Sequence, residues 1–327
     1  MHKNKILKRI IGSYEGTIKG PLFICIGGIH GNEPAGVKAI ELMVKMLEVE
    51  PIANPAFTFR GKFLGLRGNL RAIKAGKRYL KKDLNRQWTK DNVERVMVEH
   101  LSKLEEEDLE IREILETIEI ERNNYKPDKI ILLDLHTTTA FGGIFTVVTD
   151  AIDSLRIGIE LHAPVIRGLL DGIKGTVLHY FNSENIGVPT IAVCFESGQH
   201  LEPLSVNRAI AAITNCMRTI GCVRAEDVEN THDNLLIEFS KGLPSVSQLI
   251  MTHSIKPSDD FVMKLGYENF QSVKAGEVVA TDKNGPITIV EDGLLLMPLY
   301  QKQGDDGFFL IKAIDEKHLL PSHLGID

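Results

Sequence analysis

Three short apolar runs, each followed at once by glycine or a polar residue, are the clearest pattern along the chain. They span residues 22–26, 130–135 and 190–195. Runs this short, with almost no polar positions, are typical of strands buried on both faces of a mostly parallel sheet. Gly27-Gly28, His136 and Glu196 follow them. Because ligand sites in open α/β sheets lie beyond the carboxyl ends of the strands, we expect these segments to converge on one site.

Helical and irregular segments separate the runs. Apolar positions recur with helical spacing from Pro34, in residues 209–217, and less regularly across 89–122, whereas 57–66 alternates weakly and predicts a further strand. Pro34 suits the first turn of a helix. The basic, Gly- and Asn-rich stretch 67–88 predicts an ordered loop, and a loop of that length is usually functional. The acidic run 105–108 is interpreted as a solvated helix face.

The pattern changes after about residue 225, where helical periodicity fades. Short apolar runs broken by Gly, Pro, Asn and Asp predict a small β-rich domain over 225–327, following a catalytic domain over 1–224. Residues 272–279 are typical of a barrel-sandwich hairpin. The expected fold is therefore α/β, with a mixed, mostly parallel sheet flanked by helices and a C-terminal β-rich domain.

Composition narrows the function classes. Among 327 residues, 43% are hydrophobic and 25% charged, which is ordinary for a soluble globular protein, and the net charge of −6 argues against nucleic-acid binding. The four cysteines form no CxxC pair, so a Cys-ligated structural zinc is not expected. Few cysteines, no secretory segment and no membrane-length apolar window lead us to expect a cytoplasmic protein without membrane contact.

The stretch Gly27-Gly28-Ile29-His30-Gly31-Asn32-Glu33 carries the first indication of chemistry. His30 and Glu33 lie three residues apart on a Gly-bounded turn, a spacing that lets an imidazole and a carboxylate reach one ion. Catalytic zinc usually takes three protein ligands, and His2Glu is one of the known sets. His136 is the best candidate for the third ligand because it also follows a buried strand.

The sequence resembles the succinylglutamate desuccinylase/aspartoacylase family, within the zinc carboxypeptidase-like superfamily. The glycine-rich stretch around His30 matches the family signature. Three further blocks agree in order: Asn69 with Arg78-Tyr79 and Asp83-Leu84-Asn85-Arg86, then Asp134-Leu135-His136-Thr137, then Phe195-Glu196-Ser197-Gly198. The resemblance covers roughly residues 20–200.

The resemblance implies a role for each matched residue. His30, Glu33 and His136 would hold one Zn²⁺ per chain, and Glu196 would act as general base toward water and then as acid toward the leaving amine. Arg78 would polarise the scissile carbonyl and stabilise the oxyanion.

Three more residues gain roles from the same blocks. Asn85 and Arg86 would bind a substrate carboxylate. Asp83 would orient His30 from behind. The implied activity is hydrolysis of the amide bond of a small N-acyl amino acid.

Several alternatives stay open from the sequence. The same metal core would serve a zinc carboxypeptidase acting on peptides, and a non-catalytic metal-binding homologue would keep the fold. Arg167, His200 and Tyr300 are further candidates for substrate contact. The segment around Tyr300 does not match the family pattern, which leaves the acyl group and the amino acid open. The oligomeric state is open as well, a homo-oligomer included.

Overall fold

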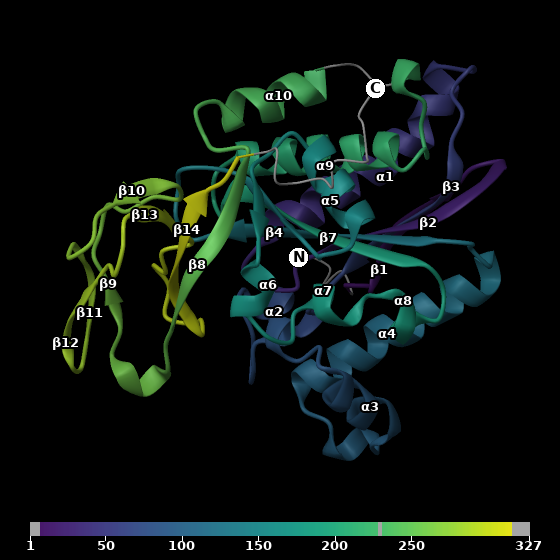
Figure 1. Cartoon of the computed structure of the whole chain (residues 1–327). Coiled ribbons are helices and arrows are strands. Elements are labelled where there is room, and N and C mark those ends of the chain that lie inside the picture. Colours follow the sequence, from purple (N-terminus) through teal and green to yellow (C-terminus); the bar gives the residue numbers. More distant parts are fainter. Residues whose placement is uncertain (1–6, 228–230, 316–327) are drawn as a thin grey trace, which may run out of the picture.

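An eleven-stranded mixed sheet forms the centre of the molecule (Figure 1). The computed structural model describes residues 7–227 and 231–315. From one edge to the other, the strand order is β1 (Ile10–Glu15), β3 (Arg60–Arg67), β2 (Ile18–Gly27), β4 (Ile130–Thr138), β7 (Thr190–Gln199), β5 (Phe145–Val148), β6 (Val165–Arg167), β8 (Val246–Ser254), β14 (Asp306–Ala313), β13 (Gly293–Leu296) and β10 (Gln271–Val273).

The three predicted buried strands are neighbours at the centre of this sheet. β2, β4 and β7 correspond to the apolar runs and pair in parallel, so their carboxyl ends lie at one edge. Gly27 is in register with Leu135, and His136 is in register with Glu196. The predicted convergence of strand ends is thus a direct result of the β2–β4–β7 pairing.

Helices cover both faces of the sheet (Figure 1). One face carries α1 (Pro34–Ala53), α5 (Ile152–Glu160), α9 (Leu204–Thr219) and α10 (Thr231–Ser240). The shorter α2 (Leu70–Ala75), α6 (Leu169–Gly172), α7 (Val177–Tyr180) and α8 (Ser183–Ile186) lie toward the other face with α3 (Lys90–Val98) and α4 (Glu106–Tyr125). Four 3₁₀ turns complete the described elements: η1 (Leu84–Arg86), η2 (Leu101–Lys103), η3 (Ala225–Asp227) and η4 (Pro257–Asp259).

The alternation of side chains along β2 divides the core into two layers. Leu22, Ile24 and Ile26 pack into the layer beneath α3 and α4, whereas Phe23 and Cys25 pack beneath α1 and α9. Successive strand residues point to opposite faces, so a continuous apolar run is what a sheet covered on both sides requires. The four cysteines are free and buried.

The C-terminal region is rich in antiparallel strands, as the sequence predicts. β8, β14, β13 and β10 are joined antiparallel, and a separate three-stranded sheet contains β12 (Gly285–Thr288), β11 (Val278–Asp282) and β9 (Val262–Met263). The main sheet runs across the expected boundary, because β6 pairs in parallel with β8. The division at residue 224 therefore stays a prediction. A helix, α10, also occupies part of the region expected to be β-rich.

The interpretation of residues 105–108 as a solvated face is wrong for two of the four residues. Glu107 and Asp108 are 0% and 1% exposed. The Glu107 carboxylate accepts hydrogen bonds from the backbone N–H groups of Leu80 (2.7 Å) and Lys81 (3.1 Å) and from Asn69 Nδ2 (3.2 Å). A carboxylate can be buried when hydrogen-bond donors face it. For Glu107, the backbone N–H groups of the basic 67–88 loop are those donors.

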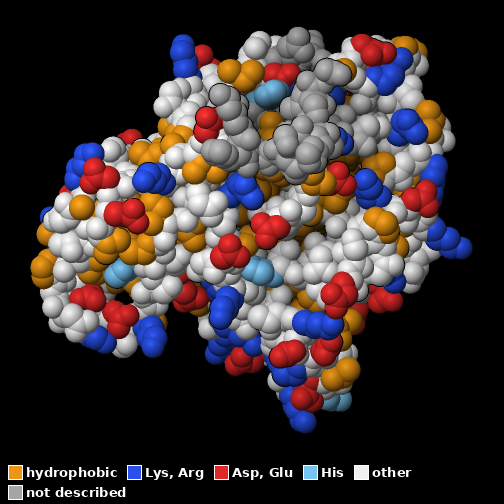
Figure 2. Space-filling model, in the orientation of Figure 1, with side chains coloured by type: hydrophobic (Ala, Val, Ile, Leu, Met, Phe, Trp, Pro, Cys, Tyr) orange, Lys and Arg blue, Asp and Glu red, His pale blue; other side chains and the backbone are white. Residues whose placement is uncertain are grey.

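Charges of both signs share the molecular surface. Figure 2 shows Lys and Arg side chains interspersed with Asp and Glu over the face in view, as expected for a net charge of −6. Across residues 7–227 and 231–315, no helix combines the length and apolarity needed to cross a membrane.

Glu107 provides a test of how the 67–88 loop is held. Glu107→Gln places an amide NH₂ where the loop presents N–H donors, so we expect the free energy of unfolding to fall by about 1–3 kcal/mol, the usual result of leaving buried donors unpaired. Urea denaturation measures it. Glu116→Gln, on the same helix with a 54% exposed side chain, is the control and should change stability little. Equal stability of the two variants would show that Glu107 does not anchor the loop.

Candidate active site

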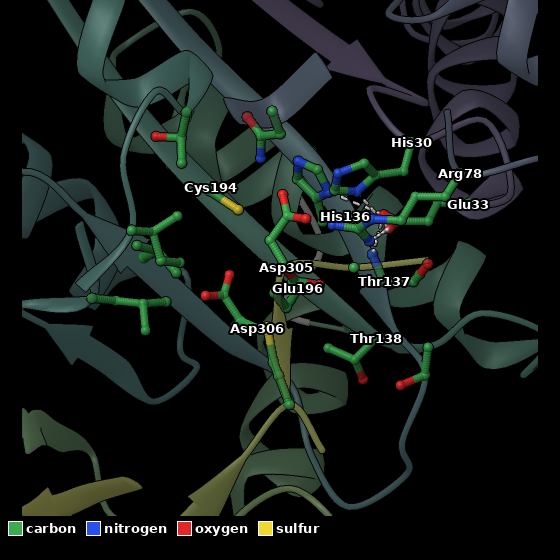
Figure 3. Close-up of a pocket in the computed structure, with 18 of the residues that line it drawn as sticks. His30, Glu33, Arg78, His136, Thr137, Thr138, Cys194, Glu196, Asp305 and Asp306 are labelled. Carbon is green, nitrogen blue, oxygen red and sulfur yellow. Dashed lines mark hydrogen bonds and ion pairs between the residues drawn. The ribbon is translucent and has the colours of Figure 1, made fainter. Parts of the chain in front are cut away.

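One pocket at the carboxyl edge of β2, β4 and β7 collects nearly all of the residues that the sequence singled out. It is lined by His30, Glu33, Arg78, Asn85, Arg86, Asp134, His136, Glu196 and His200, among others (Figure 3). Asp83 lies behind this lining, with its side chain 2% exposed. The site therefore combines the β2–α1 loop, the 67–88 loop and the ends of β4 and β7.

Glycines shape the loop between β2 and α1. Gly28 has φ +75°, a left-handed conformation that favours glycine. A Cβ on Gly31 would lie 2.2 Å from the Ala72 carbonyl carbon, so only glycine allows the loop to pack against α2. Gly31 N also donates to Arg78 O (3.0 Å). The Gly-bounded turn thus places His30 and Glu33 next to the segment that carries Arg78.

His30, Glu33 and His136 form a buried group around one carboxylate. Their exposed fractions are 4%, 2% and 3%. His30 Nδ1 lies 2.8 Å from Glu33 Oε1, and His136 Nδ1 lies 3.0 Å from Glu33 Oε2. Burial opposes ionisation of Glu33, but the two imidazoles hold its pKa well below the ordinary value.

A second carboxylate fixes each imidazole from the opposite side. His30 Nε2 lies 3.1 Å from Asp83 Oδ1, and His136 Nε2 lies 2.9 Å from Asp134 Oδ2. Burial opposes the charged form of His136, yet Asp134 and Glu33 raise its pKa well above the usual value. The pKa of Asp83 is likewise held low by Arg78 and His30 despite its burial. Both rings are oriented with Nδ1 toward the shared carboxylate.

These residues fit a metal ion. One ligand atom from each of His30, Glu33 and His136 lies within 4.8 Å of the others. The donor set is His2Glu, which suits catalytic zinc, and carboxylates behind ligating imidazoles are the usual means of fixing ring orientation. The group is thus arranged to present its donors inward.

Arg78 lies beside this group, where sequence spacing alone would give it no role. Its Nη2 is 2.9 Å from Asp83 Oδ2, and its Nη1 is 3.7 Å from Glu33 Oε1. Burial lowers the pKa of the guanidinium, but Asp83 and Glu33 raise it, so Arg78 stays charged. A fixed cation facing the pocket can stabilise negative charge that develops on a substrate oxygen.

Glu196 differs from Glu33, Asp83 and Asp134 because no side chain of the described residues forms an ion pair with it. It is 8% exposed, and its Oε2 has no hydrogen-bond partner among the described residues. Burial raises its pKa to about 8, although His136 and Arg78 act in the opposite direction. A carboxyl group that exchanges its proton near neutral pH suits general acid–base chemistry.

Asn85 and Arg86 also reach the pocket, and both are engaged by other parts of the chain. Asn85 Oδ1 accepts a hydrogen bond from the backbone N–H of Val177 (2.9 Å). Arg86 Nη2 lies 2.5 Å from Asp306 Oδ2 and its Nη1 donates to Asn85 O (2.8 Å). Their predicted contact with a substrate carboxylate stays a prediction.

Of the three further candidates for substrate contact, one lines the pocket and two do not. His200 lines the pocket, with Nδ1 2.7 Å from Thr137 Oγ1 and with Nε2 buried and unpartnered within the described residues. Tyr300 donates its hydroxyl to the backbone oxygens of Lys264 and Tyr267 (3.0 Å each) and does not line the pocket. Arg167 does not line it either.

Two sets of site residues were missed from the sequence. Asp134 lies two residues before His136 in β4, so the two side chains share one face of the strand. The Asp-x-His pattern in a buried strand is therefore a signal that could have identified Asp134. Asp305 and Asp306 line the same pocket, but Asp306 is the first residue of β14 and Asp305 directly precedes it, and no local pattern marks them.

Comparison with known protein families identifies one match. A family model for the succinylglutamate desuccinylase/aspartoacylase catalytic domain matches residues 19–220, well over half of the chain. The chain belongs to this family. The resemblance found in the sequence motifs is thus confirmed.

Similar proteins of this family and fold include one curated relative and several solved structures. A probable aspartoacylase from a Nostoc species is 33% identical over 123 residues, which cover 38% of this chain and only 37% of that protein. A Rhodobacter sphaeroides succinylglutamate desuccinylase/aspartoacylase structure has a TM-score of 0.62 at 16% identity, covering 91% of this chain and 87% of that one. Murine aminoacylase 3 has a TM-score of 0.58 at 16% identity, covering 90% and 94%. These structures share the fold.

Asp134 tests the role of the outer carboxylates. We expect Asp134→Asn to weaken zinc affinity about 10–100-fold, because the amide no longer holds His136 with a charged acceptor. Competition with a chromogenic chelator measures it. Asp128→Asn makes the same change at an exposed position just before β4 and should leave affinity unchanged. Unaltered zinc affinity in Asp134→Asn would refute this role.

Proposed function

We propose that this chain is a zinc-dependent deacylase that hydrolyses the amide bond of an N-acyl amino acid. The observation that carries the proposal is the convergence in one pocket of the His30–Glu33–His136 group, a buried unpaired carboxyl group and a fixed guanidinium. Membership of a family named for a desuccinylase and an aspartoacylase supports the reaction class.

His30, Glu33 and His136 would hold the zinc ion. When bound, zinc supplies Lewis-acid chemistry, which acidifies water and polarises a carbonyl group. Asp83 and Asp134 keep the two imidazoles in the orientation that this requires. The paired outer carboxylates also add negative charge that favours binding of a dication.

Glu196 moves the proton. As a carboxylate it takes a proton from the attacking water, and as a carboxylic acid it returns that proton to the departing amine nitrogen. Its unpartnered Oε2 in the pocket leaves it able to approach the reacting atoms. The burial that raises its pKa brings both protonation states within reach near neutral pH.

Arg78 stabilises the tetrahedral oxyanion that forms when water adds to the amide carbonyl. Asp83 holds the guanidinium through Nε (3.0 Å) and Nη2 (2.9 Å), so its position is fixed before substrate arrives. Asn85 and Arg86, farther along the same loop, would contact the part of the substrate remote from the scissile bond.

A screen of N-acyl amino acids tests the proposal directly. Zinc-loaded protein should release free amino acid from N-acetyl or N-succinyl substrates, detected by amine derivatisation. Treatment with 1,10-phenanthroline should abolish the activity, and added zinc should restore it. Turnover of a short peptide alone would instead favour the carboxypeptidase alternative.

Replacing Glu196 tests the proton-transfer role. Glu196→Gln should lower kcat about 10²–10⁴-fold while zinc content, measured by mass spectrometry, stays at one ion per chain. In the wild type, kcat/KM should rise with pH as Glu196 ionises, with an apparent pKa below the value of about 8 because a bound cation favours the carboxylate.

Glu184→Gln, at a side chain that is 80% exposed, is the matched control and should retain full activity. Activity near the wild-type level in Glu196→Gln would remove Glu196 from the mechanism.

A further inference from the structure

The floor of the pocket extends from the metal-binding group across the sheet toward β5. Cys194 in β7 is in register with Asp134 in β4 on one side and with Val147 in β5 on the other. Because in-register residues of neighbouring strands point to the same face of a sheet, this row runs from a carboxylate to a thiol and then to an isopropyl group. All three side chains line the pocket, and Figure 3 shows Cys194 and Glu196 in the same cavity. The floor thus changes from charged to apolar between β4 and β5.

Apolar side chains from α6, α7 and β14 enclose this end of the pocket. We define the apolar chamber as the part of the pocket bounded by Cys194, Val147, Leu169, Leu170, Ile173, Leu178 and Phe309. These side chains belong to one packed hydrophobic layer of the core, and Leu169 and Phe309 are each only 2% exposed. Burial raises the pKa of the Cys194 thiol well above its ordinary value, so the thiol stays neutral and acts as a small apolar group.

The apolar chamber is an unfavourable place for a charged group. Every N-acyl amino acid carries an α-carboxylate, which would lose its hydration there without gaining a cation. The guanidinium groups that line the pocket, those of Arg78 and Arg86, come from the 67–88 loop and lie in its polar part. The α-carboxylate is therefore better placed in that polar part, and the apolar chamber is left for an uncharged group. Removal of apolar surface from water is the interaction that binds such a group.

Two leucines form the far wall of the apolar chamber. Leu170 and Leu178 also line a second hollow, which lies between β5, α6, α7, α8 and the start of β7. The two side chains therefore separate one hollow from the other. Their size sets how far a bound group can extend before it meets this wall.

We propose that the apolar chamber binds an aliphatic group of the substrate and that Leu170 and Leu178 limit the length of this group. The inference rests on the proposed deacylase function and specifies its substrate class. The substrates are N-acyl amino acids that carry, besides the α-carboxylate, an aliphatic group of several carbon atoms. Such a group has the same chemistry whether it belongs to the acyl chain or to the amino-acid side chain, and the experiment distinguishes these two sources.

Two matched substrates test the binding of an aliphatic group. N-hexanoyl-glycine and N-acetyl-leucine each add four carbon atoms to N-acetyl-glycine, the first in the acyl chain and the second in the side chain. For the zinc-loaded wild type we expect at least one of them to exceed N-acetyl-glycine in kcat/KM by about tenfold or more, since each buried methylene contributes about fourfold. The substrate that gains more identifies the part that occupies the apolar chamber. Hydrolysis of all three compounds with equal kcat/KM overturns the inference.

Leu178→Ala tests the length limit. Shortening this side chain joins the apolar chamber to the second hollow, so a homologue with two further methylene groups should improve about tenfold relative to its parent substrate. Leu170→Ala should act in the same direction, and it serves if Leu178→Ala does not fold. Leu47→Ala, on α1 in the opposite layer of the core, is the matched control because Leu47 and Leu178 are 3% and 4% exposed, and it should keep the wild-type length preference. An unchanged length preference in whichever pocket variant folds overturns the inference.

A binding measurement separates this inference from the proposed function. Calorimetric titration of zinc-loaded Glu196→Gln with the same three compounds needs no turnover. Binding of N-hexanoyl-glycine or N-acetyl-leucine about tenfold tighter than that of N-acetyl-glycine supports the apolar chamber. It does so even if the wild type hydrolyses none of them, a result that would count against the deacylase alone. Equal binding of the three compounds overturns the role of the apolar chamber, even if N-acetyl-glycine is hydrolysed.

Discussion

The carboxylate of Glu33, buried between two imidazoles, is the interaction on which the site depends. A charge removed from water to this extent is tolerated only when fully partnered. Each of its oxygens lies against one imidazole Nδ1, and Oε2 also accepts the Thr137 backbone N–H at 3.0 Å. The outer carboxylates of Asp83 and Asp134 continue this arrangement on the far sides of the rings. The result is a buried polar group at the carboxyl edge of the sheet, where the pairing of β2 with β4 brings the β2–α1 loop beside His136.

The pairing of β2, β4 and β7 explains why much of the fold, and the proximity of the candidate ligands, could be predicted from the sequence. A continuous apolar run signals a strand covered on both faces, and parallel neighbours bring their ends together without further information. His136 and Glu196 each follow such a run, so their proximity required only that β4 and β7 be adjacent. The family motifs then supplied Arg78, which no periodicity distinguishes from a surface cation.

Other features depend on contacts between distant segments, which a local pattern does not contain. The sequence around Glu107 predicts a solvated side chain, because it gives no sign that backbone donors of the 67–88 loop contact this carboxylate. Asp306 is 220 residues from Arg86 in the sequence, and no pattern in the sequence around either residue predicts their contact. The domain division expected after residue 224 is limited in the same way. The change from helical to strand-like patterns there does not predict that β8 pairs with β6. A local sequence pattern predicts a single helix or strand. Contacts between segments that are distant in the sequence depend on how the whole sheet is assembled.

The late position of β14 in the chain has a consequence for how the protein is made. His30, Glu33, His136 and Glu196 all precede residue 200, so they are synthesised about a hundred residues before Asp305 and Asp306. The remaining wall, with Asp305, Asp306 and Phe309, arrives only when the last described strand pairs with β8. During synthesis, one side of the pocket therefore leaves the ribosome long before the other, and the cavity is enclosed only when the final described strand docks.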